Sequence, residues 1–503
     1  MNVLFINPNL GGVSGLNVGL AYVISSVERK HQVRLLDLSF CSKNYLQQIT
    51  RAVEEGKPDI VAFSITSFTF QNSLRLAEHI KNISPGVSFI FGGVHPTLLP
   101  EATIAHPLVD AICIGEGEGS FLEYLDKLNM GKEPDVEGIW HKSRNGHLHK
   151  NKLRPFAEKI DNLTFPNWDD WGIEKYLETN LYYLPGALKF LASRGCPYDC
   201  SFCSNKAIKE MVPGKYYRVR SVENIIQEVK FNQAKYAQRG FKSIAFGDEI
   251  FGLDFEWLKK FCALYKKENL SKQLPWVAAT RADAITEKWA ATAADAGCKM
   301  VMLGIESGDD RIRMQVYKKN ITREVILQAT SSLRNQGIIF GFYMLAGCPQ
   351  DSWPSIKASL RLVRETNPAV CHFSFYQPLP ETELVSEVKN TMWKKDKDFL
   401  GYWNIPRIST FSLSVADLRN IMQLIRISEF LRFLKLGFKL KKMVFIIDIA
   451  KYLFLPGNWK KFILMKAHIK SDLQQKTIFR YICETKVGKS PKYCYKEPES
   501  GVD

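Results

Sequence analysis

The chain has 503 residues, of which 46% are hydrophobic and 24% charged, a composition that fits about three globular domains and excludes a chain too polar to bury a core. The net charge is +16, and the eleven cysteines, without a signal-peptide pattern, predict a reducing cytoplasmic location. No run of about 20 uncharged apolar residues occurs, so a membrane-spanning helix is not expected.

Residues 1–150 alternate short β-rich runs with helical patterns, which predicts a parallel doubly wound sheet of Rossmann-like, flavodoxin-like type. The predicted strands are 2–6, 32–37, 59–64, 87–91 and 110–114, and a helix is predicted over 72–83. Ligands of such sheets bind beyond the carboxyl ends of the strands. The candidate binding residues therefore lie in the loops after strands: Asn9, Ser64, Thr66, Gly92, Gly93, His95, Gly115 and Glu116.

A hairpin or loop is predicted at 141–150, and residues 151–185, with Pro and Trp over 161–171, are predicted to form an ordered linker. The strand–helix alternation resumes over 186–385. Its predicted strands are 189–193, 243–246, 276–280, 300–305, 339–345 and 371–376. Six such units predict a partial (β/α)6 TIM-type barrel with its chemistry on the loops after the strands.

Residues 386–503 are predicted to be a helical basic region, since residues 401–503 hold 19 Lys and Arg against 8 Asp and Glu. An apolar stripe at helical spacing consists of Leu424, Ile427, Leu431, Leu434 and Phe438. The charge indicates either an acidic partner, such as the anionic inner surface of a membrane, or a solvated basic face. Residues 443–466 fit a membrane interface and equally a packed helical cap. No RNA-binding module is recognisable, so nucleic acid is not an expected partner.

Three cysteines, Cys196, Cys200 and Cys203, follow the first predicted barrel strand with the spacing C-x3-C-x2-C. A structural zinc ion takes four protein ligands, and a regular four-iron four-sulfur cluster takes four thiolates. Three thiolates bind three irons of such a cluster and leave the fourth iron open for a substrate or cosubstrate. The alternative is a zinc site completed by one of the other cysteines of this region, which are Cys262, Cys298, Cys348 and Cys371.

With an aromatic residue before its last cysteine, this motif resembles that of the radical S-adenosylmethionine (SAM) superfamily. The resemblance implies a four-iron four-sulfur cluster on the three cysteines, whose open iron chelates SAM and whose electron cleaves it to a 5′-deoxyadenosyl radical. Segments 246–251, 303–308, 344–351 and 376–384 resemble family motifs of later strand ends, although Gln350 and Glu381 replace the usual Gly. The residues that the resemblance assigns to SAM are Phe202, Gly247, Asp248, Glu249, Arg281 and Glu306.

Segments 92–97 and 115–125, together with Asp37 and the linker segment 161–168, resemble the cobalamin-binding domain that precedes many radical SAM domains. The resemblance implies a corrin over the strand ends, with glycines that let the backbone approach it. The D-x-H-x-x-G motif that supplies a cobalt ligand is absent, so cobalamin is expected to bind base-off, without a protein His on cobalt. The alternative is a domain that has lost cobalamin and is structural only.

The whole pattern is similar to class B radical SAM methyltransferases. It implies methylation of an unactivated carbon through the 5′-deoxyadenosyl radical and methylcobalamin, on a small-molecule or lipid-like substrate. An external electron donor of flavodoxin or ferredoxin type is also implied. The alternatives are a cyclisation, ring rearrangement or carbon–carbon coupling with the same cofactors, and a cobalamin-binding protein without catalysis. Formation of S-adenosylhomocysteine distinguishes methylation from the cyclisation, rearrangement or coupling reactions, because only methylation must generate it stoichiometrically.

Overall fold

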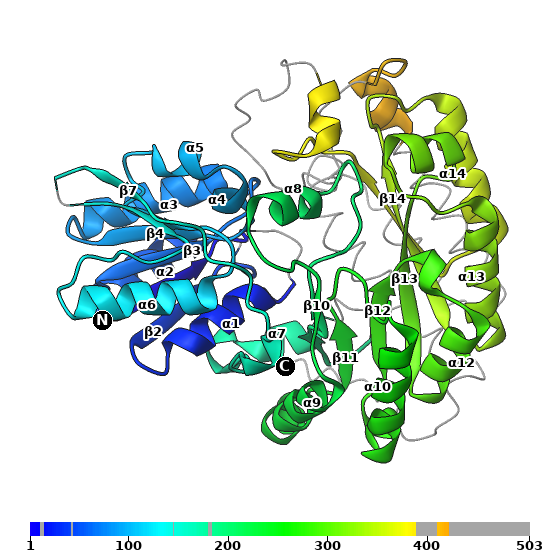
Figure 1. Ribbon diagram of the computed structural model, residues 1–503, viewed down its shortest axis with the longest axis horizontal. Coiled ribbons are helices and arrows are strands. Elements are labelled where there is room, and N and C mark those ends of the chain that lie inside the picture. The colour runs from blue at the N-terminus through cyan, green and yellow to red at the C-terminus, as the bar shows by residue number, and fades with distance from the viewer. Residues whose placement is uncertain (11–14, 42–43, 144, 180–183, 389–409, 422–503) are drawn as a thin grey trace, which may run out of the picture.

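The computed structural model describes residues 1–10, 15–41, 44–143, 145–179, 184–388 and 410–421. An N-terminal α/β part and a larger open barrel lie side by side (Figure 1). Within these ranges, no helix is long and apolar enough to cross a membrane.

The N-terminal sheet has the strand order β2-β1-β3-β4-β5-β6-β7. Its first five strands are parallel, which is the flavodoxin-like order and confirms the predicted fold class. β6 pairs antiparallel with β5 and with β7, so the segment around 141–150 is a hairpin at the sheet edge, as predicted. The strands are β1 (Asn2–Asn7), β2 (Gln32–Asp37), β3 (Ile60–Ser64), β4 (Ser88–Gly92), β5 (Ala111–Cys113), β6 (Ile139–Lys142) and β7 (Leu148–Lys150).

Helices cover both faces of this sheet. The helices at residues 18–27 and 117–129 pack on one face, in a hydrophobic core that continues into the barrel. The helices at residues 45–56 and 70–83 bury the other face in a separate core. The helices are α1 (Val18–Val27), α2 (Tyr45–Gly56), α3 (Phe70–Ile83), α4 (Val94–Leu98), α5 (Pro100–Ile104) and α6 (Gly117–Asn129). The carboxyl ends of β1, β3, β4 and β5 thus share one edge, where the candidate binding loops lie.

Short helices lie in the described part of the segment between the two parts. They are η1 (Ile160–Asn162), η2 (Asp169–Trp171) and α7 (Ile173–Glu178). Trp168 and Trp171 are buried in the core that the two parts share. The backbone N–H of Trp168 donates to the Tyr236 hydroxyl at 3.0 Å, which fixes the linker to the barrel.

The barrel is a parallel sheet in the order β15-β14-β13-β12-β11-β8, and among the described residues β8 and β15 are its two edges. This arrangement confirms the predicted partial six-stranded barrel. Its strands are β8 (Ala187–Phe190), β11 (Ser243–Phe246), β12 (Trp276–Thr280), β13 (Cys298–Glu306), β14 (Ile339–Ala346) and β15 (Val370–Phe375). The helices that follow these strands are α8 (Ser204–Met211), α9 (Val222–Tyr236), α10 (Phe255–Lys267), α11 (Leu270–Gln273), α12 (Glu287–Asp295), α13 (Arg323–Asn335) and α14 (Trp353–Thr366).

The first barrel strand begins and ends earlier than the predicted range 189–193. The chain leaves the sheet after Phe190 and forms a separate short strand, β9 (Ser193–Arg194), which pairs antiparallel with β10 (Arg218–Val219). The sheet hydrogen bond that Ala192 would make is replaced, because its N–H donates to the Asp248 carboxylate at 3.1 Å. The remaining short elements are η3 (Ala237–Arg239), η4 (Ala282–Ala284), η5 (Arg311–Val316) and η6 (Glu383–Glu387).

Little of the predicted basic region is described. Residues 415–421 are helical, and Leu418 and Ile421 are buried in the main core. Leu418 packs against Gly347, directly after β14, so this segment returns to the barrel. The apolar stripe 424–438 and the segment 443–466 lie outside the described residues.

Candidate active site

The three cysteines of the C-x3-C-x2-C motif lie in the loop between β9 and α8, at the carboxyl end of the barrel. All three are free thiols of intermediate exposure. The loop is fixed by its backbone, because the Ser201 N–H donates to the Tyr317 carbonyl at 3.1 Å and the Leu384 N–H donates to the Ser201 carbonyl at 2.9 Å. Phe202 packs edge-on against the Tyr317 ring, with centroids 5.0 Å apart, so its ring anchors the loop from below.

The strand ends bring charged side chains to the thiols. Besides burial, the negative charge of Glu249, after β11, raises the pKa of Cys196 and Cys203. The negative charge of Glu306, at the end of β13, likewise raises the pKa of Cys200. Burial raises the pKa of all three thiols, that of Cys203 to about 12. The thiols are therefore protonated at neutral pH and must release protons when they bind a metal.

Three of the four alternative cysteine ligands lie elsewhere. Cys298 and Cys371 lie at the start of β13 and near the start of β15, at the end of the barrel opposite to the motif. Cys262 is buried on α10, which covers the outside of the sheet. Cys348 lies after β14 in the hydrophobic cluster that Phe202 contacts, so it is the one alternative ligand at the same end of the barrel.

Arg281 is positioned near the motif, but its guanidinium is already paired. It donates two hydrogen bonds to Asp283, at 3.0 and 2.8 Å, and lies 3.6 Å from the ring centroid of Tyr198. Tyr198 belongs to the cysteine loop. In this structure Arg281 therefore supports the loop, whereas the resemblance assigned it to SAM.

The three residues of the G-D-E segment after β11 have different neighbours. A Cβ at Gly247 would lie 2.1 Å from Cε of Lys189, so glycine lets this lysine cross the barrel interior. The Asp248 carboxylate accepts from Ala192 N–H and from the Ser193 hydroxyl at 2.6 Å, and so holds β9 in place. Burial raises the pKa of Asp248 to about 6. Besides burial, the charge of Glu249 raises the pKa of Cys196 and Cys203. The resemblance assigned all three residues to SAM.

Glu306 adopts a left-handed backbone conformation with φ +66°, which is rare for residues other than glycine and typical of functional sites. Its buried carboxylate accepts from Lys319 at 2.9 Å. At the neighbouring strand end, the Thr280 hydroxyl is buried and has no hydrogen-bond partner among the described residues. Three thiols, two carboxylates and an unpaired hydroxyl fit an iron–sulfur cluster with SAM, whose amine is cationic and whose ribose can donate a hydrogen bond.

The candidate residues of the N-terminal edge contact mainly other residues of their own domain, and Gly115 also contacts the barrel part. Gly93 has φ +98°, and a Cβ there would lie 2.7 Å from the Ile65 carbonyl oxygen, so the glycine permits close packing of two loops. Gly115, with φ +83°, faces Val212 after α8. Ser64 is within 3.5 Å of the Asn17 amide. The other contacts are Asn9 with Ser39, Thr66 with Thr69, and Gly92 with Cys113.

His95 is the candidate with a free polar atom. Its Nδ1 lies 3.0 Å from the Ser67 hydroxyl, and its ring stacks on Phe70 at 4.2 Å. Its Nε2 is buried and has no partner among the described residues. Burial lowers the pKa of His95 to about 4, so the imidazole is neutral. An unpaired nitrogen in this loop fits a domain that receives a polar cofactor.

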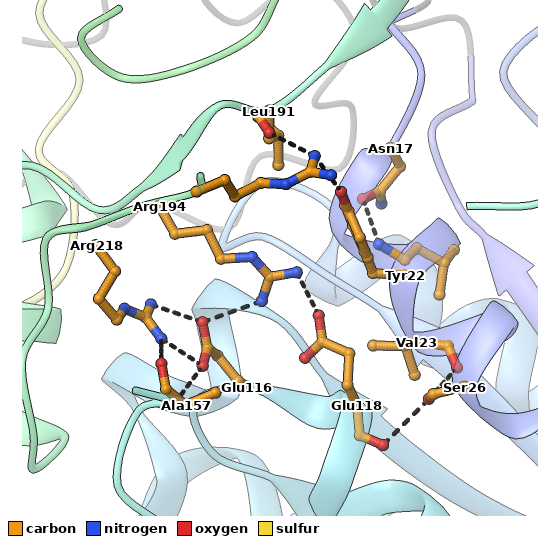
Figure 2. A network of polar contacts seen from close by, with 12 residues as sticks. Asn17, Tyr22, Val23, Ser26, Glu116, Glu118, Ala157, Leu191, Arg194 and Arg218 are labelled. Carbon is orange, nitrogen blue, oxygen red and sulfur yellow. Dashed lines mark hydrogen bonds and ion pairs between the residues drawn. The ribbon is translucent and has the colours of Figure 1, made fainter. Parts of the chain in front are cut away.

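Glu116 joins the two parts of the molecule and is not free for a cofactor. Figure 2 shows its carboxylate between Arg194 and Arg218, at 3.0 and 2.7 Å. It also accepts from the Ala157 N–H at 3.0 Å. Burial raises the pKa of Glu116, but the hydrogen bond from Arg218 and the charge of Arg194 outweigh burial and lower the pKa to about 2.

Sequence reasoning missed the basic partners of this network. Arg194, two residues before Cys196, also donates to Glu118 at 2.6 Å. Arg194 and Glu116 are 78 positions apart, and no sequence pattern relates them. The two glutamates of 115-GEGEGS-120 were nevertheless a signal for a cationic partner. The network joins the N-terminal loop after β5 to Arg194, which is two residues before Cys196 (Figure 2).

Known families match both parts of the chain. The B12 binding domain family matches residues 12–125, and the radical SAM superfamily matches residues 190–363. An uncharacterized methyltransferase of Pyrococcus horikoshii is 28% identical to this chain over 449 residues. The aligned region covers 88% of this chain and 91% of the relative. Anaerobic magnesium-protoporphyrin IX monomethyl ester cyclase of Rubrivivax gelatinosus is 25% identical over 77% of this chain and 70% of its own length.

Solved structures share the fold. The radical SAM methyltransferase TsrM from Kitasatospora setae, determined with cobalamin and a [4Fe-4S] cluster bound, superposes with a TM-score of 0.63 over 77% of each chain at 17% identity. This similarity extends over both the cobalamin-binding and the barrel parts. The chain is therefore an enzyme of the radical SAM superfamily that carries a B12-binding domain in front of its radical SAM barrel.

Proposed function

We propose that this enzyme is a cobalamin-dependent radical SAM methyltransferase that acts on an unactivated carbon. The observation that carries the proposal is the ion-paired contact of Arg194 with Glu116, which brings the carboxyl edge of the B12-binding domain beside the three-cysteine loop. When bound, the cluster with SAM supplies a 5′-deoxyadenosyl radical, and cobalamin supplies a methyl group. A substrate carbon that must meet both groups has to lie at this domain boundary.

The chain's own residues bind and orient these groups. The thiolates of Cys196, Cys200 and Cys203 hold three irons, and the carboxylates of Glu249 and Glu306 attract the cationic amine of SAM. Thr280 accepts from or donates to the SAM ribose. The barrel strands close this site from below with buried apolar side chains, which keeps water away from a reactive radical.

Anaerobic reconstitution with cobalamin tests the cofactor content. We expect about four iron atoms and about one cobalt atom per chain. Adding SAM with an isotopically labelled methyl group and a one-electron reductant should give 5′-deoxyadenosine, S-adenosylhomocysteine and label in the cobalamin fraction. Cys203→Ala should abolish 5′-deoxyadenosine. Iron without cobalt would overturn methyl transfer and leave the N-terminal domain as a scaffold.

The second candidate is a cyclisation or rearrangement with the same cofactors, favoured by the similarity to the Rubrivivax cyclase. There one electron would cleave SAM to methionine and a 5′-deoxyadenosyl radical, which would take a hydrogen atom from the substrate to become 5′-deoxyadenosine, and the methyl group would stay on methionine. Formation of 5′-deoxyadenosine without S-adenosylhomocysteine and without label on cobalamin would support this candidate over methyl transfer.

Cobalamin should bind base-off, without a protein ligand to cobalt. His95 is the histidine among the candidate residues, and it does not stand in a D-x-H-x-x-G motif. The electron paramagnetic resonance spectrum of the Co(II) form should lack nitrogen superhyperfine splitting. A splitting that disappears in His95→Ala would show that this histidine is the ligand.

The substrate is proposed to be a small or lipid-like molecule, and the electron is proposed to come from an external flavodoxin or ferredoxin. The basic residues after 421 would hold the enzyme at an anionic membrane surface. Flotation with anionic and neutral vesicles should separate the full chain from a chain ending at Ile421. The truncation belongs there because Leu418 is buried against the barrel. Equal flotation of the two chains with anionic vesicles would overturn membrane contact.

A further inference from the structure

The hairpin at the edge of the B12-binding domain carries a cluster of metal-ligating side chains far from the cysteine loop. His141 in β6 and His149 in β7 are directly opposed partners of the antiparallel pair. Opposed residues project from the same face of a sheet. Their imidazole rings are parallel, with centroids 4.8 Å apart and an interplanar angle of 3°. Glu133, in the connection before β6, reaches the same face.

One carboxylate oxygen of Glu133 lies between the two imidazoles. Oε1 is 3.8 Å from Nε2 of His141 and 3.9 Å from Nε2 of His149. These separations are too long for hydrogen bonds. One ligand atom from each of the three residues lies within 4.8 Å of the other two. The three side chains therefore converge without bonding to one another.

His141 provides the second observation. Its side chain is 4% exposed, and Nε2 is buried without a hydrogen-bond partner among the described residues. A buried polar atom without a partner costs about 1–3 kcal/mol.

We propose that Glu133, His141 and His149 form a binding site for a divalent transition-metal ion such as zinc. Imidazole and carboxylate are ligands that such ions prefer, and three protein ligands leave a fourth position for water. Ligand atoms of a tetrahedral zinc site lie roughly 3.3 Å apart. To reach this distance, the side chains of Glu133 and His149, which are 62% and 36% exposed, must move closer to His141.

The ion would act as a structural link. β6 and β7 are short and form the outer edge of the sheet, on the side of the domain away from the barrel (Figure 1). A metal that joins both strands to the segment after α6 holds this edge closed, which compensates for the few hydrogen bonds of a three-residue strand. The site is independent of the cluster and of the proposed methyl transfer.

Zinc binding by the cluster-loaded enzyme tests the proposal, because the cluster occupies the three cysteines that would otherwise bind zinc. After equilibrium dialysis against zinc chloride, we expect one zinc atom per chain in addition to the cluster. His149→Ala and Glu133→Gln should each weaken binding at least about tenfold. His79→Ala is the matched control, since His79 lies on α3 beside Thr50 and should bind zinc as the wild type does.

Hydrogen exchange gives a second measurement. Zinc should slow exchange of the amides of residues 139–142 and 148–150 in the wild type and in His79→Ala, but not in His149→Ala. Wild-type enzyme that binds no zinc, or a His149→Ala variant that binds it with wild-type affinity, would overturn the site. Zinc binding without protection of the hairpin would overturn its structural role.

Discussion

Arg194 of the cysteine loop and Glu116 of the B12-binding domain form an ion pair of 3.0 Å, although they belong to different domains. The Arg194 side chain is 14% exposed, so this pair is largely shielded from water. Because Arg194 is two residues before Cys196, the position of the cobalamin edge and that of the cluster are mechanically coupled. A small rotation between the domains would disturb the motif directly.

Glu116→Gln should destabilise the enzyme more than an exposed ion-pair variant does. The substitution leaves Arg218 buried without its counter-charge, whereas Arg194 keeps Glu118. Removing one partner of a buried ion pair typically costs about 3–5 kcal/mol. The control is Glu123→Gln, whose carboxylate is 41% exposed in its pair with Arg154. That control should cost less than about 1 kcal/mol. Urea unfolding of the two variants measures the difference, and equal midpoints would contradict the role of Glu116.

The contribution of Glu116 should depend on acidity. Its pKa is about 2 in the folded enzyme and 4.5 when unperturbed, so the folded state favours the ionised carboxylate. This difference corresponds to about 3 kcal/mol of stability. The stability is present above pH 4.5 and is lost as the pH falls toward 2. The difference in unfolding free energy between wild type and Glu116→Gln should therefore shrink across this range, and a constant difference would argue against the assignment.

Cys203→Ser should lose the cluster, whereas Cys348→Ala should keep it. Three thiolates suffice for a cluster with an open iron, and Cys348 is fully buried in the hydrophobic cluster beside Phe202. Iron analysis after anaerobic reconstitution checks both variants. If Cys348→Ala also lost its metal while remaining folded, Cys348 would be a fourth ligand, and a closed site would replace the open cluster.

Much of the fold could be predicted because most of its strands are buried runs of apolar residues, although β2 is partly exposed. The predicted ranges of β2, β11 and β12 agree with the structure to the residue. β8 was misplaced because Asp248, 56 positions away, takes the hydrogen bond of Ala192. The cysteine motif could be predicted from local spacing alone.

Contacts between distant charges could not be predicted, since neither residue identifies its partner. Glu116 was interpreted as a candidate cofactor-binding residue because its partner Arg218 is 102 positions away. Arg281 has its partner Asp283 only two positions away, but the sequence does not show that their side chains meet. Glycines were ambiguous for a similar reason. Close approach of the backbone can serve a cofactor or another loop, and at Gly93 the neighbour is Ile65.

Gly93→Ala separates these two reasons for the glycine. A Cβ would lie 2.7 Å from the Ile65 carbonyl oxygen, and φ of +98° strains any other residue. Gly131→Ala is the matched control, with φ +67° and no atom within 4 Å of its Cβ. The control should cost about 1–2 kcal/mol from backbone strain, and Gly93→Ala should cost more. If Gly93→Ala matched the control in thermal unfolding but lost cobalamin, the glycine would serve the cofactor.

Glu306→Gln should weaken SAM binding without loss of the cluster. The left-handed backbone at φ +66° and the 2.9 Å pair with Lys319 hold the Glu306 carboxylate near Cys200, where the SAM amine would lie. A neutral amide keeps the shape but removes the charge that attracts an ammonium, so the dissociation constant of SAM should rise about tenfold. Equilibrium dialysis of cluster-loaded enzyme measures this constant. Glu287→Gln, on the exposed start of α12, should bind SAM as the wild type does. Unchanged affinity in Glu306→Gln would mean that its carboxylate serves only to neutralise Lys319, and the amine would then be assigned to Glu249 alone.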